Sequence, residues 1–297
     1  MKHLFTLFFS FLFFSFSHAQ SVVYVTQNGA GNQSGGSWSD ALPGTQLQAR
    51  LASAAAGAQF WIASGTYKPT TGLDRSISFA VPSSVQVYGG FSGNEATLAN
   101  RALTSPSSTT LSGELGDQTQ ISDNTYHVVR LTNVSASTRL DGLTITGGNA
   151  NASSSPDNAG GGIYNLASAD RVSSPIIDGC QIVNNIATNG GAFYNEAQSN
   201  SSASPQLNKC NLNANRATLA GGAIHVYAYR GVCSPIITVC TFLSNQASSG
   251  ALFLSQHPLT GAITDHRSTS AFLKTIRLQT VGHSHLLVHL RHICFHQ

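Results

Sequence analysis

The chain has 297 residues, which is enough for one or two domains with a real core. Charged side chains make up only 9% of it, and five of the 15 basic and one of the 12 acidic side chains lie before residue 20 or after residue 254. The remaining 10 basic and 11 acidic side chains nearly balance. We therefore expect no nucleic-acid partner and no attraction to an anionic membrane.

The N-terminus has the pattern of a secretory signal peptide. It reads MKHLFTLFFSFLFFSFSHAQ, with a basic start and then an apolar and serine run from Leu4 to Phe16. That run is shorter than the ~20 residues of a membrane-spanning helix, and Ser17 and Ala19 are small residues before a cleavage position. The pattern predicts a signal peptide over 1–19, no transmembrane helix in the mature chain, and a location outside the cell or on the cell outer membrane surface.

One short helix is predicted near the mature N-terminus, from TQLQARLASAAAG at 45–57. Thr45 and Gln48 have the spacing of a capping box, and Leu47 and Leu51 fall on one helical face. Exposed strand edges promote aggregation, so stacks of strands need such a cap. We expect the helix to cover the open end of a stack.

Short strands separated by Gly, Asn and Ser are predicted around this helix, because the segments are rich in β-branched and aromatic residues and lack helical periodicity. They divide the chain into a cap with irregular first coils (20–125), regular repeats (126–254) and an atypical tail (255–297). The predicted early strands are SVVYVT at 21–26, QFWIASGTY at 59–67, SVQVYGGF at 84–91, TTLSGEL at 109–115, HVVRLTNV at 127–134 and RLDGLTITGG at 139–148.

A twelve-residue phrase recurs every thirty residues. SPIIDGCQIVNN begins at Ser174, SPQLNKCNLNAN at Ser204 and SPIITVCTFLSN at Ser234. A fixed period in this range indicates a solenoid, because a repeat this short cannot bury a core alone and must stack on its neighbours. Each repeat has room for three short strands, so the sequence predicts an all-β parallel β-helix with about 30 residues per coil.

Equivalent residues of stacked coils should form columns about 4.8 Å apart. Three cysteines at this spacing are too far apart and too parallel for disulfides, so we expect free, buried thiols. Three asparagines should hydrogen-bond along the stack as a ladder. The cysteine column is Cys180, Cys210 and Cys240, and the asparagine column is Asn185, Asn215 and Asn245.

Two short motifs alternate through the repeats. The first motif reads GGGI at 160–163, GGAF at 190–193, GGAI at 221–224 and a degenerate SGAL at 249–252; the second is IVNN, LNAN and FLSN, ending at Asn185, Asn215 and Asn245. Their alternation resembles the repeat of polymorphic outer membrane proteins and related bacterial right-handed β-helix surface proteins. The resemblance implies a right-handed parallel β-helix at the cell surface and says little about activity.

The amino-acid composition changes after Ala251, and seven of the eleven histidines lie in the last forty-one residues. We interpret 255–297 as the foreign or out-of-frame tail of a truncated array. Helical i, i+4 spacing of His285 with His289 and of His292 with His296 could provide zinc or nickel ligands, but the sequence lacks a recognisable finger spacing. We expect no metal site or cofactor, and the disulfide state of Cys233 and Cys294 stays open.

Catalytic residues are not predicted. Glycoside hydrolysis needs a pair of carboxylates on one patch. Asp141 and Asp178 occupy equivalent positions, but the next coils place Asn208 and Thr238 there. That column is typical of turn residues rather than of an acid and a base.

The third strand of each repeat offers the one candidate binding surface. Ile163, Phe193, Ile224 and Leu252 form an apolar column that should face inward. By alternation, an aromatic strip should face outward, where it could stack on sugar rings or contact a partner protein. An adjacent loop could instead cover the strip, or its stacking could simply stabilise the coils. The strip consists of Tyr164, Tyr194, His225 and Phe253.

The sequence thus favours a non-catalytic, exported β-helix protein that serves as a scaffold for adhesion or glycan contact. Its possible partners are a polysaccharide or the surface of a host or neighbouring cell. A polysaccharide lyase or glycoside hydrolase is the alternative, which would require acidic and basic side chains converging on one groove. A purely structural envelope protein is a third reading.

Overall fold

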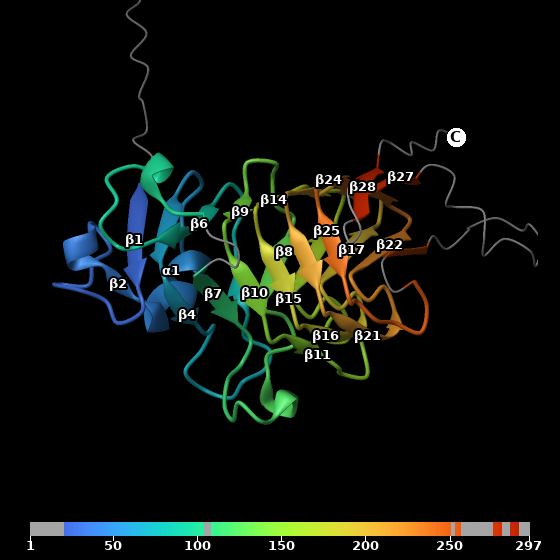
Figure 1. Cartoon of the computed structure of the whole chain (residues 1–297), viewed down its shortest axis with the longest axis horizontal. Coiled ribbons are helices and arrows are strands. Elements are labelled where there is room, and N and C mark those ends of the chain that lie inside the picture. Colours follow the sequence, from blue (N-terminus) through green and yellow to red (C-terminus); the bar gives the residue numbers. More distant parts are fainter. Residues whose placement is uncertain (1–20, 104–107, 251–252, 257–275, 281–285, 291–297) are drawn as a thin grey trace, which may run out of the picture.

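The computed structural model describes residues 21–103, 108–250, 253–256, 276–280 and 286–290. Over this part the chain folds as the predicted right-handed parallel β-helix, with five parallel sheets and one short α-helix (Figure 1). The predicted signal peptide over 1–19 lies outside the described residues.

Three long sheets form the faces of the solenoid. Sheet A has the strand order β2 (Leu42–Pro43), β1 (Val22–Thr26), β3 (Gln59–Ala63), β6 (Gln86–Phe91), β9 (Arg139–Asp141), β14 (Ile176–Asp178), β19 (Gln206–Asn208) and β24 (Ile236–Thr238). Sheet B has the order β25 (Thr241–Leu243), β20 (Asn211–Asn213), β15 (Gln181–Val183), β10 (Thr144–Thr146), β7 (Thr109–Ser112) and β4 (Gly65–Tyr67). Sheet C has the order β26 (Phe253–Gln256), β22 (Ile224–Tyr229), β17 (Phe193–Gln198), β12 (Ile163–Ala167), β8 (Val129–Thr132) and β5 (Phe79–Ala80).

Two short sheets form corners between these faces, and a hairpin follows the last described coil. Sheet D comprises β11 (Asn149–Ala150), β16 (Ile186–Asn189) and β21 (Arg216–Ala220); sheet E comprises β13 (Val172–Ser173), β18 (Ser202–Ala203) and β23 (Val232–Cys233). The hairpin pairs β27 (Ile276–Thr280) with β28 (Leu286–Leu290). The helices are α1 (Leu47–Ala52) and the 3₁₀ turns η1 (Trp38–Asp40), η2 (Gly44–Gln46), η3 (Leu98–Asn100) and η4 (Ile121–Asp123).

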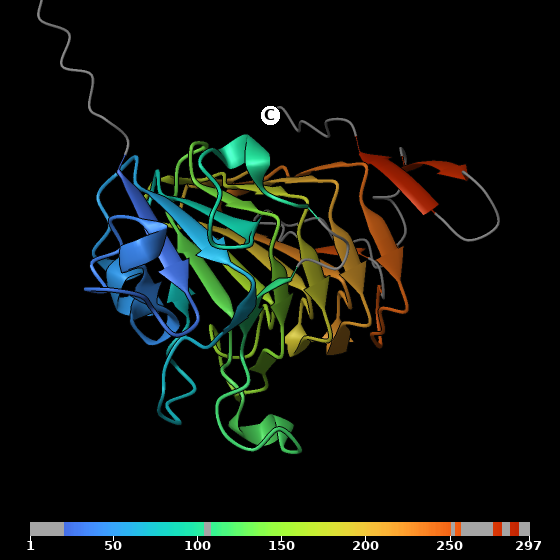
Figure 2. The same ribbon diagram turned by 60° about the vertical axis from the view of Figure 1, so that its left-hand side comes forward.

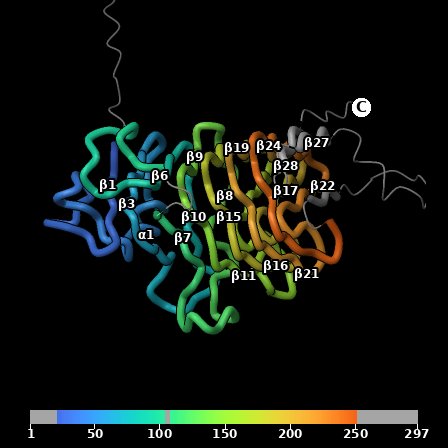
Figure 3. The backbone as a smooth tube through the Cα atoms, viewed as in Figure 1, coloured from blue at the N-terminus to red at the C-terminus, as the bar shows by residue number. Residues whose placement is uncertain are grey.

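Successive turns of the chain stack along the long axis of the molecule, from the first coils in blue to the later ones in orange (Figure 3). Loops leave this stack at two sides, and the loop that carries η4 projects well away from it (Figure 2). The repeats differ slightly in length. Ala187 pairs with Ala217, thirty residues on, whereas Asn189 pairs with Ala220, so β21 absorbs one extra residue by a register shift.

The core fills the space inside the coils with columns of like side chains. Leu140, Ile177 and Leu207 of sheet A stack in register and are at most 1% exposed. Ile145 and Ile182 of sheet B are fully buried in the same cluster. Each such side chain contributes about 1.5–3 kcal/mol of burial free energy, so the repeat pattern of apolar residues holds the stack together.

The predicted asparagine ladder is confirmed. The Asn185 amide nitrogen donates to Asn215 Oδ1 at 3.1 Å, and that of Asn215 donates to Asn245 Oδ1 at 3.0 Å. Both Asn185 and Asn215 are fully buried. A second ladder, which the sequence analysis missed, joins Asn165 Nδ2 to Asn195 Oδ1 at 2.7 Å.

The predicted cysteine column is also confirmed. Cys180, Cys210 and Cys240 are buried, free thiols that pack in the core. Burial raises the pKa of the Cys180 thiol to about 12, so it behaves as a small apolar side chain. Cys233 is a partly buried free thiol, and Cys294 lies outside the described residues.

The N-terminal helix is present but is shorter than predicted. α1 lies at the N-terminal end of the solenoid, where Leu47 and Leu51 join the core. The predicted capping box is wrong. Helix α1 continues directly from the 3₁₀ turn η2, and Gln46, the N-cap residue of α1, makes no side-chain hydrogen bond to the first turn. Gln48 Oε1 instead accepts a hydrogen bond from the Ala80 amide at 2.9 Å. The side chain thus joins the helix to sheet C rather than capping it.

In the tail, the described residues do not support the helical spacing of the histidines. His289 lies within strand β28, so the helical reading of His285 and His289 is wrong for this segment. His285, His292 and His296 lie outside the described residues. Within the described ranges, no helix has the length and apolar character needed to cross a bilayer.

Candidate functional site

The predicted aromatic strip has the expected alternation but is not exposed. Ile163, Phe193 and Ile224 point into the main core, while Tyr164 and Tyr194 form a separate cluster on the outer side of sheet C. Tyr164 is 1%, Tyr194 8% and His225 2% exposed, so the prediction of an exposed strip is wrong.

Phe253 does not belong to this column. Strand β26 pairs Phe253 with Ile224, and Leu254 with His225, so Phe253 continues the inward register. The interval from Ile224 to Phe253 is one residue shorter than the regular coil. Counting by motif therefore assigned Phe253 to the wrong face, because a slip of one residue exchanges the two faces of a strand.

Ring stacking and glycine turns bury the column. The Tyr164 and Tyr194 rings are nearly parallel with centroids 5.7 Å apart, and His225 follows at 5.1 Å from Tyr194. The first glycine of each G-G-A motif turns beside these rings with a positive φ, for example 64° at Gly190 and 65° at Gly221. A Cβ on Gly190 would lie 3.0 Å from Tyr194 Cβ, so the backbone itself covers one side of the column.

His225 is held neutral inside this column. Neither ring nitrogen has a hydrogen-bond partner in the described part of the chain. Burial lowers the pKa of His225 to about 4, from an ordinary value of 6.5. Native packing therefore disfavours the protonated ring.

We expect this depressed pKa to make the fold acid-sensitive. Above about pH 6.5 the ring is neutral in both states, and as the pH falls from there through 4 the unfolded chain binds the proton first. The free energy of unfolding should drop by about 2–3 kcal/mol between about pH 7.5 and about pH 4.5 from this group. Urea titrations at both pH values would measure it.

The control is His225→Phe, which keeps a ring in the stack without a titratable group. Other groups titrate equally in both proteins, so the parent should lose more stability on acidification than the variant. Equal losses in the two proteins would contradict the assignment to His225.

The outer face of sheet A is a second candidate surface. Its register places two columns of outward side chains over consecutive coils. The first three coils supply mainly aromatic rings and amides, and the later coils supply mainly charged and polar groups. One column is Tyr24, Trp61, Tyr88, Asp141, Asp178, Asn208 and Thr238; the other is Val22, Gln59, Gln86, Arg139, Ile176, Gln206 and Ile236.

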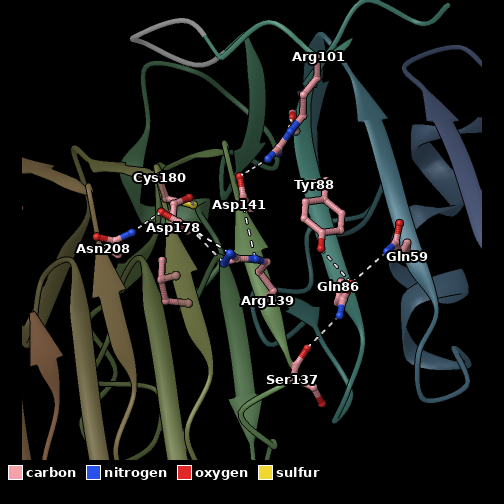
Figure 4. A network of polar contacts seen from close by, with 12 residues as sticks. Gln59, Gln86, Tyr88, Arg101, Ser137, Arg139, Asp141, Asp178, Cys180 and Asn208 are labelled. Atoms are coloured by element: carbon pink, nitrogen blue, oxygen red, sulfur yellow. Dashed lines mark hydrogen bonds and ion pairs between the residues drawn. The ribbon is translucent and has the colours of Figure 1, made fainter. Parts of the chain in front are cut away.

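Amides link the aromatic part of this face (Figure 4). The Gln59 amide nitrogen donates to Gln86 Oε1 at 3.2 Å, and Tyr88 donates its hydroxyl to the same oxygen at 2.9 Å. Trp61 Nε1 donates to Gln59 Oε1 at 2.9 Å. Trp61 is only 7% exposed, so this part is mainly structural.

A chain of ion pairs continues the face toward the later coils (Figure 4). Arg101 lies 2.8 Å from Asp141 Oδ1, and Arg139 bridges Asp141 at 3.4 Å and Asp178 at 3.1 Å. Asn208 then donates to Asp178 Oδ1 at 2.9 Å. Burial raises the pKa of Asp141, and the two arginines oppose that rise.

A depression of about 250 Å³ lies at the end of this chain. It combines polar groups with apolar flanks, and Gln206 is exposed within it. Its lining residues are Arg139, Ile176, Asp178, Gln206, Leu207, Asn208, Ile236 and Thr238.

A larger depression of about 480 Å³ lies on the outer side of sheet C, beside α1. Arg130 is its only charged lining residue, and this guanidinium packs over the Tyr164 ring at 5.8 Å. No carboxylate of the described residues lies within ion-pair distance of Arg130.

Asp141 and Asp178 stand on neighbouring strands, but arginines already pair with both carboxylates. Among the described residues, no three His, Cys, Asp or Glu side chains are grouped so that they could hold a metal ion.

No family model, curated protein or solved structure matches the chain.

Neither arginine of this chain of ion pairs was predicted from the sequence. Arg139 occupies the position of Ile176, Gln206 and Ile236 in the later coils, so alignment of the repeats could have found it. Arg101 comes from the loop after β6, which has no counterpart in the repeats. Only the folded chain brings it to Asp141.

Proposed function

We propose that this protein is a non-catalytic β-helix scaffold, exported to the bacterial cell surface, that contacts glycans through the outer face of sheet A. The proposal of export rests on the signal-like residues 1–19, and the proposed kinship with polymorphic outer membrane proteins rests on the G-G-A and x-x-N motifs. The depression beside Asp178 is the observation that carries the proposal for binding.

The chemistry of this depression suits a sugar. Gln206 and Asn208 place amides on one strand, and Ile176 and Ile236 flank them on the strands before and after. Sugar rings present hydroxyls at their edges and apolar C–H groups on their faces, which such a mixture can match. The depression spans three consecutive coils about 4.8 Å apart, so the surface favours an extended chain over a small ligand.

We expect Gln206→Ala to weaken glycan binding about fivefold to tenfold, because the ligand would lose a hydrogen bond worth about 1 kcal/mol. Gln206 is exposed and makes no side-chain hydrogen bond within the described residues, so the variant should fold normally. Binding would be measured on a glycan array and then by calorimetry with the best polysaccharide.

The matched control is Gln246→Ala, an exposed glutamine at a bridge with Arg216 on another side of the coil. This variant should bind like the parent. If Gln206→Ala bound glycans as tightly as the parent, the contact would lie elsewhere on the protein. An absence of glycan binding by the parent across the array would overturn the proposed function.

An enzyme is the second candidate, because neighbouring strands carry Asp141 and Asp178. Strands about 4.8 Å apart bring two carboxyl groups near the separation used by retaining glycosidases. The pairing with Arg101 and Arg139 opposes this role, since both carboxylates are already neutralised. Polysaccharide turnover that disappears in Asp141→Asn and in Asp178→Asn would replace the binding proposal with this one.

A further inference from the structure

Three buried side-chain oxygens in one loop have no hydrogen-bond partner in the described part of the chain. They are Glu114 Oε1, Asp123 Oδ1 and Asn124 Oδ1, and the other buried side-chain atoms of this kind belong to His127 and His225. A buried acceptor without a donor costs about 1–3 kcal/mol. Three in one loop therefore require a common explanation.

Hydrogen bonds within the loop bring the residues that carry these oxygens together near its neck. The Thr125 amide donates to the Gly113 carbonyl at 2.8 Å, which places Glu114 beside Asn124. Higher in the loop, the Asp117 amide donates to Asp123 Oδ2 at 2.8 Å and leaves Asp123 Oδ1 unpartnered. The closed loop, which carries η4, stands out from the body of the solenoid in Figure 2.

Asn124 anchors the neck and keeps one side-chain oxygen buried there. The residue is 4% exposed, and its amide nitrogen donates to the Gly147 carbonyl at 2.7 Å. This bond fixes the carboxamide with its nitrogen toward Gly147, whose main chain lies beside Glu114, and leaves Asn124 Oδ1 buried and without a partner in the described part of the chain. The Arg75 Nε donates to the Asn124 main-chain carbonyl at 2.6 Å, so the backbone is fixed as well.

No basic side chain of the described residues neutralises the two carboxylates by a direct ion pair. Lys68, the basic residue nearby, donates instead to the Leu115 carbonyl at 3.5 Å. Burial and the neighbouring Asp123 carboxylate raise the pKa of Glu114, because both disfavour its negative charge. The neck therefore concentrates negative charge and unpartnered oxygens.

We propose that the neck of the Gly113–Thr125 loop binds Ca²⁺ through the side-chain oxygens of Glu114, Asp123 and Asn124. A set of oxygen donors alone favours hard cations over zinc or copper. Ca²⁺ takes six to eight oxygens in flexible geometry, so main-chain carbonyls and water can complete the set, whereas Mg²⁺ demands near-ideal octahedral geometry. The protein supplies two carboxylates and one amide oxygen as side-chain ligands of the site.

This site is separate from the face of sheet A proposed for glycan contact, and each inference can fail alone. Its role is to hold the projecting loop on the coils, since the three ligands join the two ends of the loop. A site with few protein carboxylates should bind in the range of extracellular calcium modules, with a Kd of about 10⁻⁴–10⁻³ M.

The test is thermal unfolding of the whole protein in EDTA and in CaCl₂ at about ten times Kd, with calorimetric titration of CaCl₂ into the chelated protein. The midpoint should rise by about 3–6 °C in CaCl₂, which follows from mass action on one site in a chain of this size. In Glu114→Gln this rise should disappear, while the midpoint in EDTA should equal or exceed that of the parent because a like-charge repulsion is gone.

Glu95→Gln is the matched control, since the Glu95 carboxylate accepts amide hydrogen bonds from Ser92, Gly93 and Asn94 and has no unpartnered oxygen. It should lower the midpoint in both buffers and keep the calcium response. An unchanged midpoint of the parent, an equal rise in NaCl of matched ionic strength, or an undiminished calcium response of Glu114→Gln would each overturn the proposal.

Discussion

Replacing Asn215 with alanine is expected to lower the free energy of unfolding by about 3–5 kcal/mol, because the change leaves several buried groups without partners. Asn215 Oδ1 accepts from both the main-chain and the side-chain nitrogen of Asn185 at 3.1 Å. Its amide nitrogen donates to the Ile182 carbonyl at 2.8 Å and to Asn245 Oδ1 at 3.0 Å. Equilibrium urea unfolding would measure the loss.

Asn213→Ala is the matched control. Asn213 is the last residue of β20 and precedes Asn215 by two positions. It is partly exposed rather than buried, and its side chain makes no hydrogen bond within the described residues. Its replacement should change stability by less than about 0.5 kcal/mol. Similar losses in the two variants would mean that the ladder contributes no more than an ordinary surface asparagine.

Replacing Tyr194 with serine is expected to cost about 3–5 kcal/mol, as for other large buried aromatic side chains. The ring fills the space between Tyr164 and His225, and a serine would leave a cavity in the stack. The expected loss is far larger than that of an exposed ring used for binding. Urea unfolding of the variant would measure it.

Tyr229→Ser provides the comparison, because Tyr229 stands near the end of β22 on sheet C and is 44% exposed. We expect it to shift stability by less than about 0.5 kcal/mol. If Tyr194→Ser proved equally mild, the ring would be accessible, and the aromatic column could again be considered as a contact surface.

The sequence predicted the parts of the fold that repeat. Stacked coils put like residues in contact, so the column of Asn185 and Asn215 and the column of Cys180 and Cys210 follow from spacing alone. The helix was also predictable in place, because Leu47 and Leu51 show helical periodicity. Its capping was not, since the partner of Gln48 comes from strand β5.

The candidate sites were less predictable because they depend on what lies over each face. Alternation correctly separated Tyr194 from Phe193, but alternation says nothing about the glycine turn and the neighbouring rings that cover Tyr194. Arg101 and the neck of the Gly113–Thr125 loop lie in segments without a counterpart in the repeats, so the repeat spacing could not predict their contacts.

The register shift in β21 also bears on how the number and length of the coils can change in evolution. The extra residue before Ala220 is absorbed at one corner, and the strands of sheet C beyond it pair without a further shift. Unequal recombination between repeated gene segments therefore need not conserve an exact repeat length. Lineages can gain or lose whole coils, because small differences in length are taken up at the turns between sheets, as between Gln198 and Ser202, while the ladders keep their register.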